Sequence, residues 1–190
     1  MSRLCSAVIF VALTALPPVA MAEQLPLPQT DFSAQWELQG APEIDGPSRL
    51  TYSATLGKMR IDMQSEGQQM TMVRDLNGGE STMWSSMMPG MAMQMNTGAD
   101  AIPNGQSTGQ SDTVGGEACT VWQVEGSDIC ITADGIPVRS VGDGVTATMT
   151  SIDRSSQDAA LFEPPAGVQV MPLPQGMPGM GGMPNMALPF

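Results

Sequence analysis

A period-two alternation of apolar and polar side chains runs through this 190-residue chain and limits what it can fold into. Residues 31–38, DFSAQWEL, place Phe32, Ala34, Trp36 and Leu38 on one side, with polar residues between them. This alternation is typical of a β-strand with one buried face. Further strand-like segments lie at residues 49–56, 59–64, 69–76, 118–124, 129–132, 136–141 and 145–152.

Turn residues separate these segments, and no sustained helical period occurs. NGGE at 77–80 is a hairpin signal that leads into a second pair of strands in the methionine-rich segment 81–95. Residues 96–117 have almost no apolar side chains and predict a flexible loop. A short helical turn is expected at 156–162, before two prolines. We therefore expect a mainly all-β fold, a curved antiparallel sheet or half-barrel of eight or nine strands.

The first 22 residues predict a secretory signal peptide. Arg3 precedes an apolar run, and Ala20-Met21-Ala22 has the pattern of a cleavage site, so the mature chain is expected to begin at Glu23. The apolar run is too short for a retained transmembrane anchor. We expect a periplasmic or secreted protein with a single β domain at 23–172. Residues 173–190, rich in Met, Pro and Gly, predict a disordered low-complexity tail.

The composition excludes several functions. Without the signal peptide, the chain has six basic and nineteen acidic side chains. The resulting net charge of about −13 would repel nucleic acid. The chain has no histidine, which removes the usual general base and the commonest zinc ligand. The carboxylates of Asp62, Asp75 and Glu80 are interpreted as solvated surface charges. We expect a non-enzyme without a cofactor.

Two cysteines, Cys119 and Cys130, remain in the mature chain and flank a predicted hairpin turn. In an exported protein they are expected to form a disulfide bond. Closing so short a loop is worth about 3 kcal/mol of stability. A redox role and thiolate metal ligation are the alternatives.

Methionine is the chemically unusual residue here, since six methionines occur among the thirteen positions from 83 to 95. As flexible core residues, methionines fill irregular gaps, which is the interpretation for Met59, Met63 and Met149. As a ligand surface, they can repack around varied apolar partners. As soft thioether ligands, they select Cu(I) or Ag(I). As oxidant sinks, they are converted reversibly to sulfoxide.

The metal hypothesis depends on spacing. On one strand, Met91, Met93 and Met95 would lie at intervals of about 7 Å, too far apart for one ion unless the strand bends or Met87 and Met88 approach from the other arm. The tail has no such restriction. Its candidate ligands recur every third residue: Met177, Met180, Met183 and Met186.

The second half of the chain resembles a known family. GGEACTVWQVEG at 115–126, ICITADGIPVRS at 129–140, ATMTSI at 147–152 and LFEPPAGVQVM at 161–171 resemble a family of uncharacterised bacterial periplasmic domains. That family is similar to the outer-membrane lipoprotein carrier superfamily. The resemblance covers about residues 30–172. It implies an exported protein, a curved half-barrel closed by helices, a hairpin disulfide and a concave apolar face.

Our leading hypothesis is a non-catalytic periplasmic binding protein whose concave, methionine-lined sheet receives a lipid, a lipoprotein or another hydrophobic partner. The expected lining residues are Trp36, Tyr52, Trp84, Met87, Met88, Met91, Met93 and Met95. The first alternative is a Cu(I) or Ag(I) binder that uses Met91, Met93, Met95 and the tail methionines. The second is an envelope structural or interaction protein with no small ligand.

Overall fold

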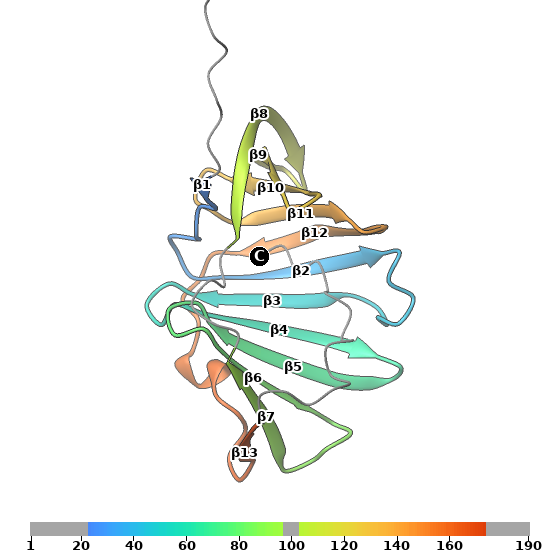
Figure 1. Cartoon of the computed structure of the whole chain (residues 1–190), viewed down its shortest axis with the longest axis vertical. Helices are drawn as coiled ribbons and strands as arrows, with labels where there is room; N and C mark the ends of the chain where they lie inside the picture. Colours follow the sequence, from blue (N-terminus) through green and yellow to red (C-terminus); the bar gives the residue numbers. More distant parts are fainter. Residues whose placement is uncertain (1–22, 97–102, 174–190) are drawn as a thin grey trace, which may run out of the picture.

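The computed structural model describes residues 23–96 and 103–173, which form one large open β-sheet (Figure 1). The first half contributes β1 (Glu23–Gln24), β2 (Phe32–Gln39), β3 (Ser48–Ser53), β4 (Lys58–Ser65), β5 (Gln68–Asp75), β6 (Glu80–Ser85) and β7 (Met91–Asn96). The second half contributes β8 (Asn104–Val114), β9 (Glu117–Val124), β10 (Ser127–Thr132), β11 (Pro137–Gly142), β12 (Val145–Asp153) and β13 (Gln169–Pro172).

The order of strands across the sheet is β1-β8-β9-β10-β11-β12-β2-β3-β4-β5-β6-β7-β13. Neighbouring strands are antiparallel except for β13, which pairs parallel to β7. The strand direction turns steadily from β8 at one end to β7 at the other, as expected for a twisted sheet (Figure 1). The all-β, antiparallel prediction is confirmed. The expected number of eight or nine strands is wrong, because the sheet has thirteen strands.

The unpredicted strands are β1, β8 and β13, and β8 is the longest of them. The interpretation of residues 96–117 as a flexible loop is wrong for 104–114, which pair with β9 through the Gly115-Gly116 turn. Only Gly105 and Val114 of β8 are buried. Because both of its faces meet solvent along most of its length, β8 needs no apolar alternation. Hydrogen bonds to β9 hold it instead.

Helical structure among the described residues is confined to one 3-10 turn, η1 (Ala159–Phe162), where a short helical turn was expected. The helices that close the carrier half-barrel have no counterpart in the described part of the chain, and the sheet stays open. None of the described segments is a helix long and apolar enough to cross a membrane.

The main core lies against β2–β5 and β9–β12. Phe32, Ala34 and Trp36 are buried, as their alternation predicted. The Phe32 and Tyr52 rings lie 5.9 Å apart between centroids on adjacent strands. The interpretation of Met59, Met63 and Met149 as core residues is confirmed, since all three are buried in this cluster. A smaller cluster contains Leu25, Val124, Ile129 and Ile131.

Two local predictions are also confirmed. Cys119 on β9 and Cys130 on β10 form a disulfide, with their Cα atoms 5.4 Å apart. The two residues lie diagonally across the hairpin, because Cys119 is opposite Thr132. The NGGE turn joins β5 to β6. The Asp75 carboxylate accepts the backbone N–H groups of residues 77 and 78 in this turn, each at 2.8 Å.

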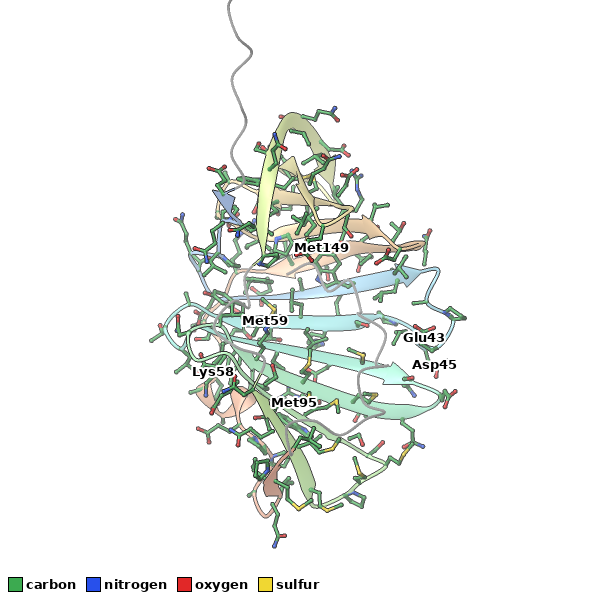
Figure 2. The ribbon with its side chains drawn as sticks, in the orientation of Figure 1. Glu43, Asp45, Lys58, Met59, Met95 and Met149 are labelled. Carbon is green, nitrogen blue, oxygen red and sulfur yellow. A yellow bond between two sulfur atoms is a disulfide. The ribbon has the colours of Figure 1, made fainter. Side chains whose placement is uncertain are left out.

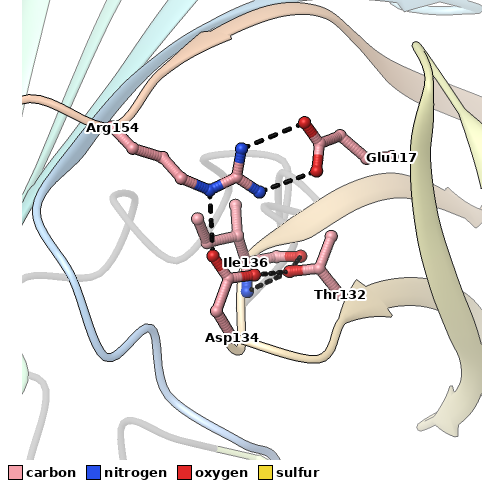
Figure 3. A network of polar contacts seen from close by, with 5 residues as sticks. All are labelled: Glu117, Thr132, Asp134, Ile136 and Arg154. Carbon is pink, nitrogen blue, oxygen red and sulfur yellow. Dashed lines mark hydrogen bonds and ion pairs between the residues drawn. The ribbon is translucent and has the colours of Figure 1, made fainter.

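An ionic network ties the end of β12 to two other elements (Figure 3). Arg154 donates to both carboxylate oxygens of Glu117 at 3.0 and 2.7 Å, and to Asp134 at 2.9 Å. The Thr132 hydroxyl donates to Asp134 and accepts the N–H of Ile136. The hydrogen bond from Arg154 lowers the pKa of Glu117. Burial alone would raise the pKa of Asp134, but hydrogen bonds from Thr132 and Arg154 lower it more.

Candidate functional site

One face of β4–β7 and β13 carries half of the methionines of the chain. We call this surface the methionine face, and strand register places nine residues on it: Met59, Met63, Met70, Met72, Met83, Met91, Met93, Met95 and Met171. The chain has eighteen methionines in total. Sulfur atoms are visible over this half of the sheet in Figure 2, where Met59 and Met95 are labelled.

Local sequence explains why these side chains share a face. Successive residues of a strand point to opposite sides, so Met91, Met93 and Met95 of β7 lie on one side. Met70 and Met72 of β5 do the same. The tight turns between β4, β5, β6 and β7 then fix the register that brings the strands' methionines together.

Four of these residues form a continuous line across the sheet, which we call the methionine row: Met72, Met83, Met93 and Met171. Each is directly opposite the next on the neighbouring strand. Residues directly opposite have Cβ atoms about 4.5–5.5 Å apart, whereas alternate residues along one strand are about 7 Å apart. The thioethers therefore approach one another across the strands more closely than along them.

Accessibility along the methionine row is lowest at Met83 and highest at Met171. Met83 is 7% exposed and Met171 is 45% exposed, while Met72 and Met93 are half-buried. The turn η1 packs against β4. The bond from Arg60 to the Leu161 carbonyl places η1 on the opposite face, because Arg60 is opposite Val73 and not a methionine. The row thus combines a desolvated centre with an accessible end.

The expected lining residues are divided by the structure. Trp36 and Tyr52 are buried in the core, each 4% exposed, and Tyr52 is directly opposite Met59 at the margin of the methionine face. Met91, Met93 and Met95 lie on this face. Met87 and Met88 lie in the turn between β6 and β7, and Met87 is 68% exposed. The tail candidates Met177, Met180, Met183 and Met186 lie outside the described residues.

Trp84 lies on the opposite face. It follows Met83 directly in β6, so the two side chains point to different sides of the sheet. The Arg60 guanidinium carbon is 5.8 Å from the centroid of the Trp84 ring. The period of two was a sufficient signal for this separation, and the expected grouping of Trp84 with the methionines overlooked it.

The opposite face carries a row of mostly polar residues, beside the buried apolar residues Val73 and Ala92. Gln35, Arg49, Asp62, Thr71 and Trp84 are opposite one another on β2 to β6. The Asp62 carboxylate accepts two hydrogen bonds from Arg60, at 2.8 and 2.7 Å, and one from Thr71 at 2.8 Å. A pocket of about 200 Å³ on this side is lined by Gln35, Pro47, Arg49, Asp62, Met63, Gln64, Gln69, Met70 and Thr71. The Asp62 carboxylate in its lining already accepts three hydrogen bonds from the protein.

The methionine face offers thioethers and apolar surface, with a single guanidinium at its margin. Arg74 lies on this face opposite Met59 and Ser81, and burial lowers its pKa. Within the described ranges, no group of histidine, cysteine, aspartate or glutamate side chains could hold a metal ion. Thioethers are therefore the most numerous candidate ligands on this face, and Arg74 is its charged group.

Comparison with known proteins gives the fold alone. No family model and no curated protein matches the chain. An uncharacterized conserved protein from Thermus thermophilus is similar in structure, with a TM-score of 0.56, 16% identity and coverage of 76% of this chain and 91% of the other. PNGF-II is also similar in two crystal forms, with TM-scores of 0.57 and 0.55, 10% and 11% identity, and coverage of 76% of this chain. This chain spans only 31% and 32% of those PNGF-II chains.

Proposed function

We propose that this chain is an exported, non-catalytic periplasmic binding protein whose methionine face receives the acyl chain of a lipid or lipoprotein. The observation that carries the proposal is the gathering of nine methionines on one side of five adjacent strands. We include in this proposal that the chain is related to the lipoprotein carriers and that its sheet forms a half-barrel.

The properties of methionine support an apolar ligand. Its side chain is unbranched and polarizable, so it adapts to a flexible chain at little cost. Burying apolar surface contributes about 25 cal/mol per Å². Met91 and Met171 keep 38% and 45% of their surface exposed, so apolar area is available at the margin of the face.

The contrast between the two faces supports a one-sided ligand. The side opposite the methionines carries the hydrogen-bonded polar side chains of Arg60, Asp62 and Thr71, which are costly to remove from water without partners. An acyl chain would therefore contact the methionine side. The disulfide between Cys119 and Cys130 is compatible with export to an oxidising compartment.

Native mass spectrometry tests the proposal. The full chain would be expressed with its own leader, purified without detergent and analysed for co-purified lipid, and binding of a fluorescent fatty acid would be measured in parallel. We expect M72Q/M93Q to weaken probe binding by about tenfold or more, because two amides would be desolvated. V141Q is the matched control, because Val141 is 41% exposed on β11, outside the methionine face. A lipid-free mass in repeated preparations, together with no probe binding, would exclude the acyl ligand and favour an envelope interaction protein.

A further inference from the structure

We propose that Met72, Met83 and Met93 form a binding site for a soft monovalent cation, Cu(I) or Ag(I). The inference goes beyond the proposed acyl ligand, because it depends on sulfur lone pairs and not on apolar area. Met83 on β6 is directly opposite Met72 of β5 on one side and Met93 of β7 on the other.

The register brings the sulfurs within reach of one ion. Zinc–sulfur bonds are about 2.3 Å long, and bonds of similar length to Cu(I) would place two ligand sulfurs roughly 4 Å apart. Neighbouring strands are about 4.8 Å apart, so the backbones at Met72 and Met93 are about 9.6 Å apart and both side chains must turn their sulfurs toward Met83. The three rotatable side-chain bonds of methionine allow this. Met171 on β13 continues the row and offers a fourth thioether.

The donor set selects the ion. Soft thioethers favour Cu(I), whereas Mg²⁺ and Ca²⁺ require oxygen ligands. Within the described strands β4–β7 and β13, the methionine face carries no carboxylate, histidine or cysteine. A hard cation would therefore find no suitable ligands on this face.

Charge and burial favour a monovalent ion. Arg74 lies on the same face two residues from Met72, and its positive charge would repel a divalent ion about twice as strongly as a monovalent one. The low exposure of Met83 restricts competition by water at the centre of the site, while the half-buried Met72 and Met93 leave access for an ion. The strongly acidic composition of the chain attracts cations in general.

The geometry also changes which methionines are the expected ligands. Met91, Met93 and Met95 are close in sequence but lie along β7, about 7 Å between successive members and about 14 Å between Met91 and Met95. Met93 has nearer partners in Met83 and Met171 across the strands. Met72, Met83 and Met93 are therefore the residues to test, and Met91 and Met95 on the same face serve as the control.

Anaerobic titration of Cu(I) against a chromophoric chelator would measure the affinity of the full mature chain, and Ag(I) would be titrated separately. M72L/M83L/M93L keeps the face apolar and removes three sulfurs, while M91L/M95L is the matched control. We expect the first variant to lose Cu(I) affinity by about tenfold or more and the second to change by less than about threefold, following the soft-ligand preference. Methyl NMR of labelled methionines should show shifts of Met72, Met83 and Met93 on adding Ag(I).

The outcomes separate the two proposals. Methionine-to-leucine changes nearly conserve side-chain volume, so M72L/M83L/M93L should remain folded, and circular dichroism checks this. If M72L/M83L/M93L still binds the fatty acid but no longer binds Cu(I), the three sulfurs are needed for the cation and not for the acyl chain. Failure of the wild type to bind either ion at micromolar affinity, or full affinity in M72L/M83L/M93L, would overturn the site even if lipid binding were found. Ion binding lost only on truncation after Leu173 would likewise overturn it and assign the ligands to the tail.

Discussion

At the scale of single residues, Arg154 has the most extensive ionic contacts in the described part of the chain. It follows β12 and joins Glu117 at the start of β9 to Asp134 in the turn between β10 and β11. The bidentate contact with Glu117 fixes the guanidinium plane, which is the geometry in which a partly exposed ion pair contributes most. The stability of this corner should therefore depend on pH.

We expect R154Q to lower the free energy of unfolding at pH 7 by about 1 kcal/mol, the upper end for surface ion pairs. The pKa values of Glu117 and Asp134 lie below their ordinary values of 4.5 and 3.8. Depressed carboxyl pKa values give stability that is present above the unfolded pKa and lost as the pH falls through the folded pKa. The difference between wild type and R154Q should therefore shrink as the pH falls below about 4.5.

Urea denaturation at pH 7, 5 and 3 measures this difference. R49Q is the control, because Glu117 and Asp134 form their ion pairs with Arg154 and not with Arg49. An R154Q effect that stays constant down to pH 3 would contradict the ionic explanation and indicate lost packing.

At this scale, the sequence predicted which side chains share a face of a strand, but not which strands are neighbours. The alternation of Phe32, Ala34 and Trp36 predicted their common burial, and the same rule places Met83 and Trp84 on opposite faces. The pairing of Met83 with Met72 and Met93 could not be predicted from the sequence, because it depends on the register of three strands. Spacing within one strand therefore suggested a different set of ligands.

At the scale of elements, predictability followed burial. Strands with one face in the core, such as β2, β4 and β12, show alternation and lie close to their predicted ranges. β8 is polar on both sides and gave no such signal. Its pairing with β9 depends on a glycine turn and on backbone hydrogen bonds. The pattern of apolar and polar side chains does not indicate either of them. The long-range parallel pairing of β13 with β7 is equally invisible in local sequence.

The disulfide between Cys119 and Cys130 joins β9 to β10. We expect C119A/C130A to lower the free energy of unfolding by about 3 kcal/mol, since the bond restricts the unfolded chain over a short loop. Guanidinium denaturation of the variant and of the wild type, each with and without a reductant, measures the effect. The reductant should destabilise the wild type and leave the variant unchanged. A variant as stable as the oxidised wild type would show that hairpin pairing and core packing hold these strands without the bond.

At the scale of the whole molecule, an open sheet of thirteen strands must protect two edges. The two-residue β1 covers part of β8, and the four-residue β13 covers β7. β13 also ends the methionine row, so the strand that protects this edge also limits the proposed ligand surface. Edge protection and the functional face are therefore coupled at β7.

This coupling predicts the behaviour of two truncated chains. A chain ending at Glu163 lacks β13 and leaves the backbone groups of β7 unpaired, beside a row of methionines. We expect it to self-associate, because an exposed edge next to apolar side chains is a template for another strand. A chain ending at Leu173 keeps β13, including the bond from the Leu173 N–H to the Gln94 carbonyl at 2.8 Å, and should elute as its full-length parent does. Size-exclusion chromatography with light scattering compares them over a range of concentrations. If both truncated chains had the same mass at every concentration, β13 would not protect the edge, and the limit it sets to the methionine face would lose its support.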